Sequence, residues 1–363
     1  MAFIDLHAHY PMHTQFPPRV GSDVSDEGKK LEFFVANQLL NFVSGHPRVT
    51  LTEFEAGSPG GAGSVLYDPD DEFFRDAKPR PVAFQNLLAQ IENVEKEIAA
   101  SHGAVAIAKN PADVNRFFQA NQRFLFHCME GAFAFGGDPG NVAKAAAQGV
   151  AYVIIAHLFF RGVATCANAF PFLPDELFAV LNPDQDAKTG LTPLGEEIVS
   201  EVFRNRMLVD ITHCSDLARA DIFRIAKNFP GSPVISSHNG VQHQSAYPLN
   251  LSDDTLRQIA DTGGVMGVIL YPHWLRQPAE QIFGADGFPV LFQTIQHIGD
   301  VVGFDHVAIG SDLDGFIKPV KGCETYAQTP ALESAVRARF PNDADKILSG
   351  NVLRVLNAGW KGV

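Results

Sequence analysis

The chain has 363 residues, of which 46% are hydrophobic and 19% charged, a composition typical of a globular protein. Its formal net charge of −13 and its lack of a basic run argue against a nucleic-acid partner, because binding to phosphates needs clustered Lys and Arg. No stretch approaches the roughly 18 uninterrupted apolar residues of a membrane span, so we expect no membrane partner.

The first nine residues predict a strand that ends in an acid and two histidines. Side chains two residues apart point to the same face of a strand, so Asp5, His7 and His9 can project together. Neutral imidazole is a common ligand of catalytic metals, and a neighbouring carboxylate can orient such a ring. Taken alone, this pattern suits a buried strand with polar residues at its exit equally well.

The segment that follows is too long for a tight connection between a strand and a helix. We interpret residues 10–60 as an insertion beside the site, containing a helix near residues 28–44 and able to act as a lid. A second strand is expected at 61–67. Apolar spacing then predicts helices at 82–100 and 111–120.

From residue 123 onward, short apolar strands alternate with amphipathic helices. This alternation indicates parallel strands joined by helical crossovers. Eight strands are predicted, near residues 2–7, 61–67, 123–129, 150–156, 207–212, 233–237, 264–270 and 306–311. We therefore predict an α/β fold, a closed (β/α)₈ TIM barrel that forms one domain over residues 1–363. An open doubly wound sheet is the alternative, but no glycine-rich phosphate-binding pattern follows the first strand.

Side chains of the type that bind metals follow most of the predicted strands. They are His7, Glu130, His157, His213, His238 and Asp312. Barrel enzymes place their catalytic groups at the carboxyl ends of the strands, where these six residues lie. Histidines and carboxylates without paired thiols favour a catalytic rather than a structural metal site.

Six candidate ligands exceed the needs of one ion and suggest two metals that share a bridge. Glu130 can span two ions, whereas one imidazole lone pair cannot. Two metals can polarise a carbonyl and hold a hydroxide between them as the nucleophile. Asp312 could take the proton of the attacking water and return it to the leaving group.

The residues resemble the membrane (renal) dipeptidase family, a branch of the amidohydrolase superfamily, over most of residues 2–12 and 60–357. The matching motifs are Asp5-x-His7, Met129-Glu130-Gly131, the strand ending at His157, Gly190-Leu-Thr-Pro-Leu-Gly195, Val209-Asp-Ile-Thr-His213, Ser236-Ser-His238, Gly310-Ser-Asp-Leu-Asp-Gly315 and Asn351-Val-Leu-Arg-Val355. The resemblance implies a barrel that holds two zinc ions. It assigns one ion to His7, His9 and Asp312 and the other to His213 and His238, with Glu130 as the bridge. It also implies that His157 contacts the substrate carbonyl.

Two positions depart from the pattern of that family. The family usually has Asp at position 9, so His9 retains a ligand but removes one negative charge. Eleven residues after His238 the family has an arginine that binds the terminal carboxylate of the dipeptide, and here that position is Leu249. Leucine cannot form a bidentate ion pair, so the substrate is expected to lack a free α-carboxylate unless Arg161 or Arg276 substitutes.

The resulting prediction is a cytoplasmic metallohydrolase that cleaves an amide or peptide bond of a small, dipeptide-like molecule. Expected substrate contacts are His157, Leu249, Arg161, Tyr247 and His273. Two alternatives are a metallohydrolase acting on an ester or lactone, and a non-catalytic binding protein. The family often forms dimers, which makes a homodimer an implication of the resemblance alone. The cytoplasmic expectation rests on a strand that begins at residue 2 and on four widely spaced, unpaired cysteines.

Overall fold

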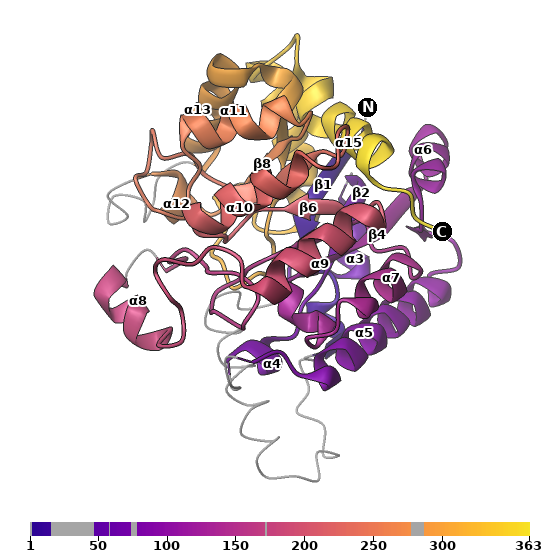
Figure 1. Ribbon diagram of the computed structural model, residues 1–363. Helices are drawn as coiled ribbons and strands as arrows, with labels where there is room; N and C mark the ends of the chain where they lie inside the picture. Colours follow the sequence, from indigo (N-terminus) through magenta and orange to yellow (C-terminus); the bar gives the residue numbers. More distant parts are fainter. Residues whose placement is uncertain (1, 16–46, 58, 74–77, 171–172, 277–286) are drawn as a thin grey trace.

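Eight parallel strands form a barrel, and helices surround it (Figure 1). The computed structural model describes residues 2–15, 47–57, 59–73, 78–170, 173–276 and 287–363, so the helix expected near residues 28–44 lies outside the described part. The barrel strands, in spatial order, are β1 (Phe3–Ala8), β2 (Pro59–Leu66), β4 (Arg123–Glu130), β5 (Tyr152–Ile154), β6 (Leu208–Asp210), β7 (Val234–Asn239), β8 (Met266–Val268) and β9 (Val307–Ile309). Each lies at a predicted position, and the TIM-barrel prediction is confirmed.

The barrel closes where the segment after β9 meets β1. Ala8 and Leu313 form a parallel bridge, the His9 amide donates to the Leu313 carbonyl at 3.0 Å, and the Asp312 amide donates to the His7 carbonyl at 2.9 Å. The first and last candidate ligands are therefore held side by side by backbone hydrogen bonds.

A ninth strand, which the sequence pattern did not predict, lies beside the barrel. This strand, β3 (Val105–Ala108), pairs with residues 123–126 of β4, whereas β5 pairs with Met129 and Glu130 at the other end of β4. Four residues with two alanines carry too short an apolar pattern to stand out in the sequence.

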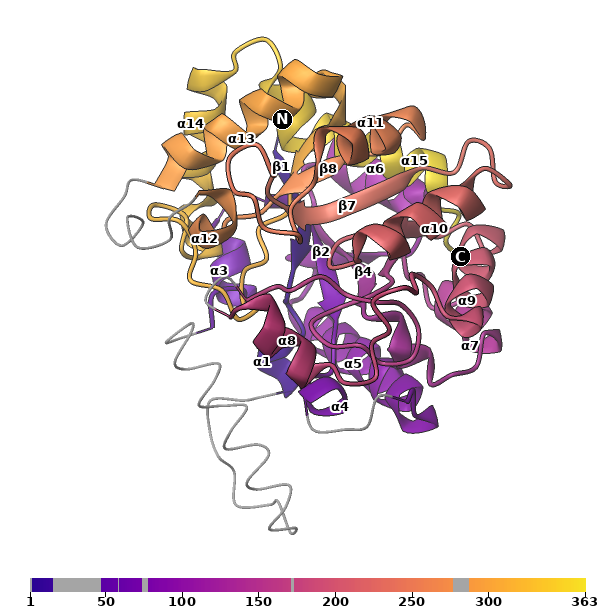
Figure 2. The same cartoon turned by 60° about the vertical axis from the view of Figure 1, so that its left-hand side comes forward.

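The longer helices follow the strands and cover the barrel from outside (Figures 1 and 2). They are α5 (Pro81–Ala100), α6 (Pro111–Gln119), α7 (Gly140–Ala146), α9 (Pro193–Arg204), α10 (Asp216–Ala226), α11 (Asp253–Asp261), α13 (Gly287–Val302), α14 (Thr329–Arg339) and α15 (Asn351–Gly359). A further helix, α8 (Asp175–Leu181), lies in the segment between β5 and α9 and stands apart from them in Figure 1. Polar caps begin several of them: Asn110, Thr192, Ser215 and Ser252 each accept a backbone amide of the first turn.

Short helical turns complete the described chain. They are α1 (Met12–Gln15), α3 (Leu51–Ala56), α4 (Pro69–Phe73), α12 (Pro272–Leu275), the 3₁₀ turns at Ala132–Phe135, Phe304–His306 and Tyr326–Gln328, and a π turn at Lys346–Gly350 that leads into α15. The turn α4 lies in a charged segment that the sequence pattern describes only as turn-rich. It supplies a residue of the site described below.

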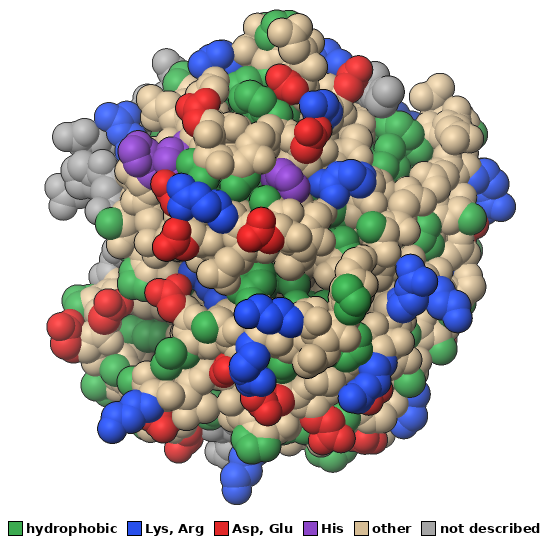
Figure 3. Space-filling view, turned by 45° about the horizontal axis from the view of Figure 1, so that its top comes forward, with side chains coloured by type: hydrophobic (Ala, Val, Ile, Leu, Met, Phe, Trp, Pro, Cys, Tyr) green, Lys and Arg blue, Asp and Glu red, His purple; other side chains and the backbone are tan. Residues whose placement is uncertain are grey.

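The hydrophobic core runs through the barrel and out to the helices. Strand residues such as Leu6, Phe126 and Val209 are fully buried. On the face drawn in Figure 3, acidic and basic side chains are interspersed, so the net negative charge is not gathered into one patch there. Within the described residues, none of the helices has the length and apolar character needed to span a membrane.

Candidate metal centre

Ligand-type side chains from six strand positions converge at the carboxyl end of the barrel. His7, Glu130 and His238 lie within or at the end of β1, β4 and β7. The other three, His157, His213 and Asp312, each lie three residues beyond the end of β5, β6 and β9. All six are 5% exposed or less, so the barrel holds a buried polar cluster in which most neighbours are titratable.

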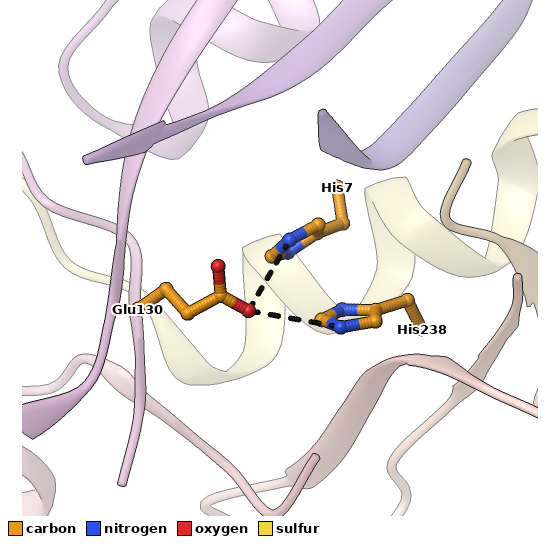
Figure 4. A group of neighbouring side chains, drawn as sticks. All are labelled: His7, Glu130 and His238. Carbon is orange, nitrogen blue, oxygen red and sulfur yellow. Dashed lines mark ion pairs between the residues drawn. The ribbon is translucent and has the colours of Figure 1, made fainter. Parts of the chain in front are cut away.

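Glu130 is the centre of this cluster. Its Oε1 lies 3.5 Å from His157 Nε2 and 3.6 Å from the Nε2 atoms of His7, His213 and His238. Figure 4 shows the carboxylate facing the two rings of His7 and His238 from the opposite wall of the barrel. The Nε2 atoms of His213 and His238 lie 3.1 Å apart, so these two nitrogens face one small volume beside Glu130 Oε1.

The other oxygen of Glu130 faces the acidic half of the cluster. Glu130 Oε2 lies 3.1 Å from His9 Nε2, which is also 3.2 Å from Asp312 Oδ1. One carboxylate thus presents Oε2 to His9 and Oε1 to His213 and His238. This is the arrangement that a bridging ligand requires.

Neighbouring groups fix the tautomer of His7. The Tyr152 hydroxyl donates its hydrogen to the Leu6 carbonyl at 2.8 Å. Its oxygen is therefore the acceptor in the 3.0 Å contact with His7 Nδ1, which must carry the ring hydrogen. As a result, Nε2 of His7 presents a lone pair toward Glu130 and Asp312, as a metal ligand must.

Several buried atoms of the cluster lack hydrogen bonds within the part of the chain that the structure describes. They include His7 Nε2 and both carboxylate oxygens of Glu130. Buried polar groups are rarely left unsatisfied, and an unpaired buried carboxylate is costly. Lone pairs of imidazole and carboxylate that point at one another without hydrogen bonds fit a site built for divalent cations.

Two of the ligand positions have strained backbones. His213 and Asp312 adopt φ values of 64° and 57°, in the left-handed region that non-glycine residues seldom occupy. Such conformations cost free energy and persist where the surrounding structure imposes them, often at functional sites. Gly315 allows the tight turn, because a Cβ there would lie 1.9 Å from Asp312 Oδ1.

Two buried carboxylates brace the strand ends from below. Asp5 accepts hydrogen bonds from the amides of His7 and Ser311 at 3.1 and 2.8 Å, and from the Tyr326 hydroxyl at 2.9 Å. Asp210 does the same for Thr212 and Ser237. Burial raises the pKa of each acid to about 6, although these hydrogen bonds act to lower it.

The electrostatics divide the imidazoles of the cluster into two groups. Burial lowers the pKa of His7 and His238 far below the usual value, and burial together with nearby His157 lowers that of His213 to about 4. Burial alone would also lower the pKa of His9, but the carboxylates of Glu130 and Asp312 outweigh it and raise the value to about 10.

The carboxylates of the cluster differ in the same way. Burial raises the pKa of Asp312 to about 7, although the hydrogen bond from His9 opposes the shift. For Glu130, burial is outweighed by the imidazoles of His157, His7 and His9, which hold its pKa well below the usual range.

Comparison with known proteins identifies the family. A family model described as membrane dipeptidase (Peptidase family M19) matches residues 35–359. The chain belongs to this family. Membership places it among metal-dependent dipeptidases, and the family prediction made from the motifs is confirmed.

Individual relatives match most of the chain. The chain is 29% identical to dipeptidase aclJ of Aspergillus oryzae over 277 residues, which are 75% of this chain but only 60% of aclJ. It is 30% identical over 284 residues to the uncharacterized protein in the pqqA 5' region of Klebsiella pneumoniae, covering 76% of this chain and 96% of that protein.

Solved structures share the fold at lower identity. A metallo peptidase from Rhodobacter sphaeroides, solved with a phosphinate mimic of the dipeptide L-Ala-D-Ala, matches with a TM-score of 0.78 at 21% identity over 99% of both chains. The probable dipeptidase PvdM from Pseudomonas aeruginosa gives 0.76 at 20% identity, over 99% of this chain and 96% of that one. At these identities the likeness concerns the fold.

Two of the positions expected to contact substrate, Leu249 and Arg161, are engaged in contacts within the protein. The Leu249 side chain is fully buried in the hydrophobic core, and its carbonyl accepts a hydrogen bond from the buried Arg219. Arg161 donates its Nε to the Glu72 carbonyl at 3.0 Å and its Nη1 to the Phe160 carbonyl at 2.8 Å. The position that holds arginine in the family therefore has a buried, uncharged side chain here, and Arg161 binds backbone carbonyls.

Aromatic residues, rather than cations, stand next to the ligand rings. Trp274 stacks on His238 with centroids 6.1 Å apart, and its indole N–H donates to the Ala169 carbonyl at 3.0 Å. Tyr271 contacts Trp274 and the half-buried His273. Tyr247 is also half-buried. Burial is the largest cause of the raised pKa of Tyr271 and Tyr247 is the next, so the two tyrosines lie near each other.

One residue of the site was missed by the sequence analysis. Glu72, in α4, is fully buried and its Oε2 lies 2.5 Å from His157 Nδ1. It lies in a run of four acids, Asp68 and Asp70–Glu72, in which no pattern marks it. It lies in α4, beyond Leu66 at the end of β2 and farther from its strand than His157, His213 and Asp312 are from theirs, so the strand-end pattern does not reach it.

Proposed function

We propose that the protein hydrolyses an amide bond of a small, dipeptide-like substrate, using two divalent metal ions, most simply zinc. One observation supports this above all others: a single buried carboxylate, Glu130, faces imidazoles with both of its oxygens at the catalytic end of a TIM barrel. A metal site without a bridging ligand would not need one carboxylate that faces imidazoles with both of its oxygens.

His9 and Asp312 would hold the first ion and His213 and His238 the second, with Glu130 contacting both. His7 lies between the halves, because its Nε2 is 3.6 Å from Glu130 Oε1 and 3.7 Å from Asp312 Oδ1. We assign it to the first ion by analogy with the family. When bound, such ions polarise the scissile carbonyl and acidify the attacking water.

Asp312 is the proton carrier in this proposal. Its carboxylate takes a proton as a water oxygen attacks the carbonyl carbon, and then delivers that proton to the departing nitrogen. A C–O bond forms, the C–N bond breaks, and the products are a carboxylic acid and an amine. Burial alone would lower the pKa of His157, but the carboxylates of Glu130 and Glu72 outweigh it and raise that pKa. The ring can therefore carry hydrogens on both nitrogens, and its Nε2–H, which faces the cluster, donates a hydrogen bond to the carbonyl oxygen as negative charge develops there.

The preferred substrate in this proposal lacks a free α-carboxylate. The side chain of Leu249 is buried at the position where the family has a carboxylate-binding arginine. The Arg161 guanidinium donates hydrogen bonds to the carbonyls of Glu72 and Phe160. A carboxylate brought beside Trp274 and Tyr271 would lose water without gaining a bidentate partner from Leu249 or Arg161, and Arg276, the other arginine considered, is exposed at the end of α12. A blocked or neutral amide would not meet this cost.

A matched pair of substrates tests the proposal. The zinc-loaded protein is assayed with free dipeptides and with the same dipeptides carrying a C-terminal amide, and Asp312→Asn is the inactive control. Faster hydrolysis of the amidated series supports both parts of the proposal. Preference for the free dipeptides would overturn the substrate class, and the absence of metal-dependent hydrolysis in both series would overturn the activity.

A further inference from the structure

We propose that Glu72 is a positioning residue for catalysis, which fixes the ring orientation of His157 and keeps a hydrogen on its Nδ1. This inference deepens the proposed function and rests on it, because His157 is assigned there to the substrate carbonyl. Glu72 comes from α4, a short turn after β2, and not from the strand ends that supply the ligands.

The Glu72 carboxylate is buried and fully engaged. Its Oε2 accepts the Tyr67 hydroxyl at 2.7 Å and lies 2.5 Å from His157 Nδ1, while its Oε1 accepts the Phe159 amide at 2.8 Å. An ionised carboxylate has no hydrogen to donate, so His157 must donate its Nδ1–H to it. The other ring nitrogen, Nε2, is thereby directed at Glu130, 3.5 Å away.

Packing holds the ring in the same orientation. The Tyr67 ring meets His157 edge-on with centroids 4.6 Å apart, and His213 meets it from another side at 4.5 Å. The Tyr67 hydroxyl thus fixes the carboxylate, and the Tyr67 ring fixes the imidazole. A short hydrogen bond to a charged acceptor is also stronger than a neutral one, so the carboxylate keeps a hydrogen on His157 Nδ1.

A purely structural role is the competing explanation. Glu72 connects the segments after β2 and β5, and the Phe159 amide alone would justify a buried acceptor. The two explanations differ in one respect: only a positioning role requires that the effect of losing Glu72 disappear when His157 is absent. The neighbouring Asp71, which pairs with Arg80, is a matched buried acid on the same turn that has no contact with His157.

The kinetic experiment compares Glu72→Gln, His157→Ala, the double variant and Asp71→Asn, each loaded with zinc. We expect Glu72→Gln to lower kcat by about 10- to 100-fold, with a smaller change in KM and unchanged metal content. We expect no further loss in the His157→Ala background and near-normal kcat for Asp71→Asn. A Glu72→Gln loss of equal size in both backgrounds would overturn the proposal.

A spectroscopic experiment does not depend on turnover. Histidine nitrogens are observed by NMR in the zinc-loaded protein, and His157→Gln identifies the signals of His157. The proposal predicts a ring that carries a hydrogen on Nδ1 in the unchanged protein and that loses this hydrogen in part or completely in Glu72→Gln. An unchanged His157 signal in that variant would overturn the inference, even if the substrate class in the proposed function proves wrong.

Discussion

The two halves of the metal centre are built from different chemistry although they share Glu130. The half around His9 holds two carboxylates against one ring, and the pKa of that ring is raised to about 10. The half around His213 and His238 consists of rings in which burial disfavours charge: it lowers the pKa of His213 to about 4 and that of His238 well below its usual value. The first half therefore holds a proton when no cation is present, whereas the second holds only lone pairs.

This difference indicates how a departure from the family pattern can be tolerated. With His in place of Asp at position 9, the first half has one negative charge fewer and must release a proton before it can bind a cation. Asp312 and Glu130 remain to offset the charge of the incoming ion. We therefore expect the two halves to respond separately to substitution.

The largest effect is expected from Asp312→Asn, which removes the proton carrier and weakens one ligand of the first half. General acid–base groups contribute about 10²- to 10⁴-fold, so we expect kcat to fall by at least about a thousandfold. Steady-state rates with the amidated substrates, together with metal analysis, measure this change. A variant with nearly normal kcat would exclude Asp312 as the proton carrier.

His213→Ala should remove one metal ion and leave the other. The second half has His238 and Glu130 Oε1 as its remaining ligands, while His9, Asp312 and Glu130 Oε2 are untouched. Elemental analysis should show a drop of about one ion per chain, with turnover lost. Retention of the full metal content, or loss of all metal, would show that the halves do not bind independently.

A buried histidine outside the cluster supplies a control on acid stability. His127 is fully buried, and burial lowers its pKa to about 4, whereas an unfolded histidine titrates near 6.5. The unfolded chain therefore binds a proton first as the pH falls. The free energy of unfolding should decrease by roughly 3 kcal/mol between pH 6.5 and pH 4 through this residue alone.

Urea unfolding of the zinc-loaded protein and of His127→Gln across this pH range measures that contribution. The difference in unfolding free energy between the two proteins should change with pH below 6.5 and stay constant above it. A constant difference at every pH would mean that His127 is not held neutral by burial.

The smallest effect is expected from His9→Asp, which restores the usual residue of the family. The added negative charge should tighten binding of the first ion and reduce the number of protons released on loading, while the second ion is little affected. Calorimetric titration of metal-free protein with zinc, in buffers of different ionisation enthalpy, separates binding from proton release. Unchanged proton release would contradict the account of His9.

The barrel and its ligands could be predicted from the sequence because both follow simple periodic rules. Buried parallel strands appear as short apolar runs, and a ligand such as His157 or His213 follows the run directly. Glu72 follows no such rule, because its partner His157 is 85 residues away and is brought to it by the barrel. The burial of Leu249 could not be predicted either, because the spacing shows the residue type at this position but not the surroundings of its side chain.

The most direct test of the bridged centre is the metal content of the unchanged protein. Protein purified without added metal, and protein reloaded with zinc and freed of excess, are both analysed for ions per chain. We expect close to two ions after loading, because Glu130 presents one oxygen to each half of the cluster. A value that stays at one ion after loading would contradict it.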